Sequence, residues 1–133
     1  MPAMPAAKQG DMIQAMDTHI VMVPSPGGPV PVPTPGHPFT GLIDGSLSAD
    51  VLIMGRPAAT VSSTATNQPP HLPIGGASFQ VPPTNRATIV QGSTTVFING
   101  LPAARQGDLA LTCDDLMPTP HGQVIATGTV LIG

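Results

Sequence analysis

One short pattern occurs three times in this chain, and that repeat restricts the folds open to it. The clearest copy covers residues 87–108 and reads ATIVQGSTTVFINGLPAARQGD. Its β-branched and aromatic run at 94–98 favours a strand, and Asn99-Gly100 favours a tight turn because both residues tolerate positive φ. The unit therefore predicts strand, turn and strand, followed by a compact P-A-A-x-x-G-D segment that leaves the hairpin.

Two more copies follow the same plan. Residues 41–63 read GLIDGSLSADVLIMGRPAATVSS. Residues 122–133, GQVIATGTVLIG, form the hairpin without its tail, and that tail, PAAKQGD, lies within residues 1–11 at the other end of the chain. A hairpin cannot bury its apolar face alone, whereas three around an axis can. We therefore expect one all-β domain over 1–133, a compact cone or pyramid of three pseudo-three-fold β-hairpin repeats, with neighbouring chain ends.

The composition agrees with an all-β chain. The chain has 15 Gly and 18 Pro, and it contains no Glu, Trp or Tyr. Because 41% of its residues are hydrophobic and their runs alternate with turn signals, most of the chain is not disordered. Only four residues are Lys or Arg, and so low a charge suggests that a partner covers part of the surface.

The same sequence argues against several functional classes. A net charge of −3 disfavours nucleic-acid binding, which needs a basic face. We expect no membrane-spanning helix, because no run of 18 apolar residues occurs, and no secretory signal is visible. The single cysteine, Cys113, cannot form an intrachain disulfide. We expect synthesis in the cytoplasm.

Three arms connect the repeats, at 12–40, 60–87 and 109–121. Within the first arm, residues 24–38 hold seven prolines and are interpreted as a polyproline-like loop. A disordered linker and an ordered extended loop held at His37 both remain open for this segment.

The arms carry every residue that suits a borderline metal: His19, His37, His71, Cys113 and His121. His19 and His71 each lie twelve residues after the last Ala of a P-A-A segment, and Cys113 lies nine after the third. In a three-fold cone, such positions converge on the axis. Either His37 or His121 would then complete a tetrahedron. The competing interpretation is a set of separate surface or hydrogen-bonded histidines and a buried free thiol.

A tetrahedral Cys and His set suits Zn²⁺, and four protein ligands make a zinc site structural. A small chain with proline-rich arms gains order from such an ion. Asp114 and Asp115, next to Cys113, are interpreted either as a solvated turn or as carboxylates that orient a metal-bound histidine. Asp11 and Asp108 follow glycines and are interpreted as turn or cap residues.

The P-A-A segments, above all Pro102-Ala103-Ala104-Arg105 within the pattern of residues 92–108, resemble the motif of the PAAR-repeat family. The resemblance covers nearly the whole chain. It departs in the proline-rich first arm and in the first repeat, which lacks the Arg and the G-D pair. The resemblance implies a single PAAR-like domain with a β-cone fold whose tip holds zinc through three His and one Cys. By position, His19, His71 and Cys113 match this set, and the resemblance of the first arm favours His37 as the fourth ligand, with His121 in reserve.

The family caps the trimeric spike of contractile injection machines, such as type VI secretion systems and extracellular phage-tail-like particles. The first arm looks like the version found with extracellular particles. The resemblance thus implies a non-enzymatic spike tip that zinc stabilises. The tip is expected to be monomeric when free and to dock once per spike trimer. On firing, it is expected to be delivered outside the cell or into a target cell. The sequence, without an extension at either end, suggests a tip with no fused toxin. The alternatives are a small zinc hydrolase with Asp114 or Asp115 as its base, and a tip adaptor that docks effectors through residues 24–38.

Overall fold

The computed structural model describes residues 3–133, so Met1 and Pro2 of the split third repeat lie outside the described residues. The described chain is all-β, without a helix, as the sequence predicts. Its strands are β1 (Met4–Pro5), β2 (Met12–Val23), β3 (Val30–Gly45), β4 (Leu52–Ile53), β5 (Arg56–Pro57), β6 (Thr64–Asn67), β7 (Ser78–Phe79), β8 (Arg86–Ile89), β9 (Phe97–Ile98), β10 (Leu101–Pro102), β11 (Leu109–Leu111), β12 (Gly122–Ile125) and β13 (Leu131–Ile132). No helix in this part of the chain is long and apolar enough to cross a membrane.

Six strands close into a small antiparallel barrel. The order is β2-β3-β6-β8-β11-β12, and the pairing of β12 with β2 completes the circle. The barrel contains three antiparallel pairs, each formed by the strands at the two ends of an arm: β2 with β3, β6 with β8, and β11 with β12. The main core fills its interior with small and branched side chains around Ile13, Ile43, Ile89 and Val124. The predicted fold class, three hairpin repeats about a pseudo-three-fold axis, is confirmed.

The P-A-A segments meet at the barrel's broad end in a closed ring of hydrogen bonds. The N–H of Ala7 donates to the carbonyl of Ala104 at 2.9 Å, that of Ala104 to Ala59 at 3.0 Å, and that of Ala59 back to Ala7 at 3.0 Å. All three alanines are fully buried. Backbones can approach this closely only where the side chain is small. The repeated Ala-Ala pair is therefore what permits three-fold closure.

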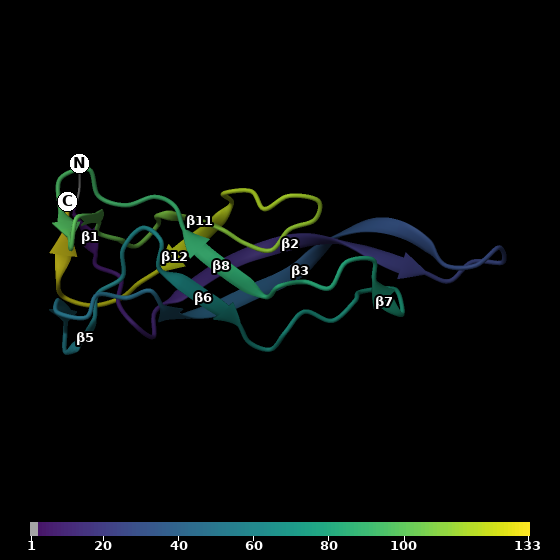
Figure 1. Cartoon of the computed structure of the whole chain (residues 1–133), viewed down its shortest axis with the longest axis horizontal. Helices are drawn as coiled ribbons and strands as arrows, with labels where there is room; N and C mark the ends of the chain where they lie inside the picture. The colour runs from purple at the N-terminus through teal and green to yellow at the C-terminus, as the bar shows by residue number, and fades with distance from the viewer. Residues whose placement is uncertain (1–2) are drawn as a thin grey trace.

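Three short antiparallel strand pairs form the base around this ring: the hairpins β4 with β5 and β9 with β10, and the pair of β1 with β13, which replaces the hairpin expected within residues 122–133. The last pair joins the two ends of the chain, with Met4 opposite Ile132, and Figure 1 shows the N and C labels side by side at this end. One buried isoleucine from each strand pair, Ile53, Ile98 or Ile132, packs in a second core with the first alanines of the three P-A-A segments. The expected proximity of the termini follows from this pairing.

The turn after each P-A-A segment is capped by a side chain. Asp11 and Asp108 accept the N–H of the residue three positions earlier, at 3.0 and 2.7 Å, and the hydroxyl of Ser63 does the same at 3.0 Å. The first repeat, which lacks the G-D pair, therefore keeps the cap with a single hydroxyl oxygen as the acceptor. The cap interpretation of the two aspartates agrees with these bonds.

The proline-rich segment differs from the loop expected over residues 24–38. Strand β3 begins at Val30, and only residues 24–29 form the turn that connects it to β2. The prolines at 31, 33 and 35 alternate with residues that keep their N–H, so the strand still pairs with β2. Figure 1 shows this long β2–β3 hairpin extending away from the base beyond the other strands.

Candidate metal centre

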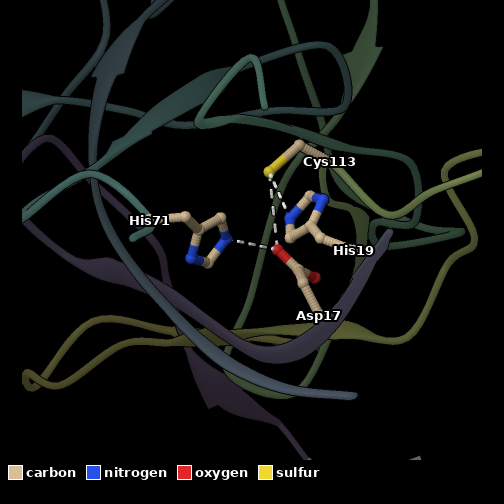
Figure 2. Close-up of side chains that lie close together, drawn as sticks. All are labelled: Asp17, His19, His71 and Cys113. Atoms are coloured by element: carbon tan, nitrogen blue, oxygen red, sulfur yellow. Dashed lines mark hydrogen bonds and ion pairs between the residues drawn. The ribbon is translucent and has the colours of Figure 1, made fainter. Parts of the chain in front are cut away.

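Four buried side chains from distant parts of the chain gather at the end of the barrel away from the base. Asp17 and His19 belong to β2, His71 follows β6, and Cys113 follows β11. Their ligand atoms all lie within 4.8 Å of one another, and each residue is buried. Figure 2 shows the sulfur, the carboxylate and the two imidazoles pointing towards a common centre. All three arms thus contribute to one cluster, as the matched offsets predict for His19, His71 and Cys113.

The spacing of these atoms suits a single ion. Cys113 Sγ lies 3.7 Å from His19 Nε2 and 3.5 Å from Asp17 Oδ2, and Asp17 Oδ2 lies 3.0 Å from His71 Nε2. Ligands at zinc bond lengths in a tetrahedron are separated by about 3.3–3.6 Å. The donor set, sulfur with imidazole nitrogen, is the one that zinc prefers. The residues present therefore fit a zinc ion.

His37 lies on β3, directly across the ladder from Asp17, and its ring stands beside the cluster. Its centroid is 5.3 Å from that of His19 and 5.8 Å from that of His71, while those two are 4.8 Å apart. Three imidazoles on one tetrahedral zinc would have centroids about 5.2 Å apart. The ring spacing therefore suits a three-histidine site.

The nitrogens of His37 have other partners as well. Nδ1 lies 3.1 Å from the carbonyl of Thr34, and Nε2 accepts the N–H of Ile74 at 3.3 Å. The first contact places the proton on Nδ1, and the second uses the lone pair of Nε2. The second contact is long, and it must be given up if Nε2 binds a metal. His37 and Asp17 are thus the two candidates for the fourth position.

His121 lies outside the set of His19, His71 and Cys113, and it meets the cluster only through Asp17, whose Oδ1 is 3.4 Å from His121 Nε2. Its side chain is 36% exposed, and its Nε2 lies 3.1 Å from the carbonyl of Met16. Its Nδ1 is 3.0 Å from Asp114 Oδ2. It therefore belongs to an outer group with Asp114 and Asp17, rather than to the set with His19, His71 and Cys113.

The two aspartates after Cys113 tie the third arm to β2. Asp114 accepts the N–H of Thr18 at 2.8 Å, and Asp115 accepts that of Ile20 at 2.9 Å. Asp115 Oδ2 also lies 3.5 Å from His19 Nδ1, a buried nitrogen that has no hydrogen-bond partner among the described residues. For Asp115, the contact with His19 favours a carboxylate that orients a metal-bound histidine over a solvated turn, whereas Asp114 contacts the backbone of β2 and His121.

Burial controls the protonation of the cluster. Burial and the charge of Asp17 raise the pKa of the Cys113 thiol to about 12. Burial lowers the pKa of His19 and of His37, so both imidazoles are neutral at pH 7. Burial opposes ionisation of Asp17, but hydrogen bonds from His71, Thr112 and Cys113 outweigh it and lower the pKa of that carboxyl. The thiol therefore needs a nearby cation to ionise.

The residue that sequence reasoning missed is Asp17. The offsets from the P-A-A segments single out histidines and the cysteine, and they give no weight to a carboxylate. A signal was available, because Asp17 and His19 are two residues apart on a strand and therefore share a face. Any site that uses His19 on that face must accommodate Asp17.

Fold and cluster together define a small single-chain β-protein with internal three-fold symmetry and a buried metal-type site. The PAAR motif family model matches residues 22–117 and 80–133, and two overlapping matches suit a repeated motif. The chain belongs to the PAAR motif family, which confirms the resemblance found in the sequence. No curated protein matches the chain. The family consists of structural, metal-binding spike-tip proteins, and membership supports a spike-tip role in contractile injection systems.

Proposed function

We propose that this protein caps the trimeric spike of a contractile injection machine, one tip per trimer, and sharpens it for piercing a target envelope. The closed alanine ring carries the proposal, because it gives one chain a three-fold face. A monomer with such a face can make the same contact with each subunit of a trimer. The tip is made in the cytoplasm, joins the particle there, and leaves with the spike on firing.

The base exposes apolar side chains at equivalent positions around this face. Leu52, Phe97 and Leu131 each precede the buried isoleucine of their strand pair, and they are 60%, 57% and 57% exposed. Large apolar side chains gathered on one surface mark a docking site. Three of them in three-fold arrangement suit three identical pockets at the end of a spike.

Docking is tested by native mass spectrometry of the tip with its spike protein. We expect one tip per spike trimer, and a Leu131→Asp variant that binds at least tenfold more weakly. Leu42→Asp is the matched control, because Leu42 is 49% exposed on β3, away from the base hairpins, and its substitution should leave docking unchanged. A free homotrimer of the tip, or undiminished docking of the Leu131→Asp variant, would contradict the proposal.

We further propose that His19, His37, His71 and Cys113 hold a structural zinc ion. The ring spacing supports His37. Asp17 would give up its hydrogen bonds from His71 Nε2 and the Cys113 thiol when those atoms bind zinc, and it would keep the bond from the Thr112 hydroxyl. Ordering an arm costs about 1–2 kcal/mol per residue, and zinc binding in small peptides contributes roughly 10–16 kcal/mol. An ion linking all three arms would therefore stabilise a narrow apex that has little room for a core.

The fourth ligand is tested with two variants and zinc affinity as the readout. His37→Ala should lose most of the affinity, whereas Asp17→Asn should retain the ion with a smaller loss. The opposite ranking would assign the fourth position to Asp17.

A further inference from the structure

The outer part of the β2–β3 hairpin, residues 18–36, together with β7, forms a projecting three-stranded sheet that we call the distal blade. Strand β7 pairs with one edge of β2 through Val21 and Met22. Strand β6 pairs with β3 only from Gly41 to Gly45, so within the described residues no strand covers the outer edge of the blade. Figure 1 shows the tip of this hairpin as the point farthest from the base.

Beyond its inner end, where Asp114 and Asp115 accept the N–H groups of Thr18 and Ile20, the distal blade carries no charged side chain, and the three histidines in it and beside it are buried. Residues 18–43 and 68–85 contain no Asp, Glu, Lys or Arg. Their exposed side chains include Val30, Val32, Ile74 and Val81, which are 42%, 39%, 45% and 55% exposed. A neutral and apolar surface fits an apolar medium, and it offers no ionic contact to a charged partner.

Prolines remove the hydrogen-bond donors from the free edge. Proline cannot donate to a ladder, so the pairing of β3 with β2 uses the N–H groups at 30, 32 and 34. The outward positions at 31, 33 and 35 are all proline and expose no N–H. Such an edge cannot accept an added strand, which argues against a peptide partner. It also leaves no unpaired donors if water is removed.

Two hydrogen bonds within the turn at the tip satisfy some of its polar groups. The N–H of Gly28 donates to the carbonyl of Ser25 at 3.0 Å, and the Ser25 hydroxyl donates to the carbonyl of Gly28. Pro24, Pro26 and Pro29 flank these residues and have no N–H. The tip of the β2–β3 hairpin therefore has few hydrogen-bond donors that depend on water for a partner.

We propose that the distal blade is a lipid-binding wedge that partitions into the interfacial layer of a phospholipid bilayer. The inference deepens the proposed function, because it names lipid as the partner of the leading surface. It requires no spike for its test, so either proposal can fail while the other stands.

The chain lacks Trp and Tyr, so the fluorescence of a single introduced tryptophan reports on the environment of that one position. Val32→Trp places it on the distal blade, and Phe97→Trp places the matched control on the base. With phosphatidylcholine vesicles, we expect a blue shift of Val32→Trp emission and quenching by brominated acyl chains, with much smaller changes for Phe97→Trp. No shift for Val32→Trp, or equal shifts for both, would overturn the proposal.

A second measurement uses charge. Val32→Asp should reduce partition of the full chain into the same vesicles at least tenfold, while Val130→Asp, at a base position that is 40% exposed, should not. Both variants should keep the melting temperature of the parent. Adding phosphatidylglycerol should not raise partition, because the chain carries a net charge of −3. Binding that requires anionic lipid, or that Val32→Asp leaves intact, would refute the wedge, and spike docking of the same variants shows separately whether capping holds.

Discussion

Replacing Ser62 with glycine should stabilise the protein, because Ser62 occupies a backbone conformation that favours glycine. The three turns after the P-A-A segments place Gly10, Ser62 and Gly107 at equivalent positions, with φ of +90°, +83° and +87°. Each N–H donates to a carbonyl of the barrel, at 3.1, 2.9 and 2.8 Å respectively. The fold thus imposes positive φ on all three positions, and only the first repeat has a residue other than glycine there.

The magnitude follows from two opposing terms. Relief of the left-handed conformation is worth about 1–2 kcal/mol, whereas the extra freedom of glycine in the unfolded chain costs about 0.4–1 kcal/mol. The Ser62 side chain is exposed and makes no hydrogen bond among the described residues, so its removal loses little else. We expect a gain of about 0.5–1 kcal/mol in the free energy of unfolding, and a melting temperature higher by about 2–4 °C.

Thermal and urea unfolding of the metal-loaded protein measure this gain. The reciprocal variant, Gly107→Ser, is the control, because a Cβ at Gly107 would meet no atom within 4 Å and the backbone conformation alone decides its effect. It should be destabilised by a similar amount. A Ser62→Gly variant that melts at a lower temperature than the parent, or a neutral Gly107→Ser variant, would refute the equivalence of the three turns.

Three further predictions concern the metal centre. Cys113→Ser should lower both zinc content and melting temperature; a melting curve that chelator leaves unchanged would count against a structural ion. Because the pKa of the Cys113 thiol is raised to about 12 while burial keeps His19 neutral, zinc binding near pH 7 should release about one proton, and log affinity should rise by about one per pH unit. Calorimetry in buffers of different ionisation enthalpy measures that proton, and affinity independent of pH would be inconsistent with it. Asp115→Asn should weaken zinc binding by about tenfold, because it removes the carboxylate charge that lies 3.5 Å from His19 Nδ1. Competition with a chelating dye measures this affinity, and an unchanged affinity would show that Asp115 does not orient His19.

Much of the fold could be predicted because the repeated residues are the ones that three-fold packing requires. The Ala-Ala pairs are needed where three backbones meet, and the offset of the third copy follows from the pairing of β1 with β13. The convergence of His19, His71 and Cys113 follows from the same symmetry, because equivalent offsets from a three-fold ring lead to one region.

The course of the proline-rich segment and the fourth ligand could not be predicted from composition or from spacing along the chain. Prolines at 31, 33 and 35 suggest a loop when counted, but their alternation is compatible with an edge strand. Asp17 lies outside the repeat offsets, and its place in the cluster depends on strand parity and on the fold of the other two arms. The choice between Asp17 and His37 depends on side-chain directions, which spacing along the chain does not contain.

Elemental analysis with zinc-edge X-ray absorption on the purified full-length chain tests most directly whether one ion joins the three arms. We expect one zinc per chain, with one sulfur near 2.3 Å and three nitrogens near 2.0–2.1 Å in the first shell. A chain that folds without metal and gains no stability from added zinc, or an ion without a sulfur ligand, would contradict a zinc-stabilised apex.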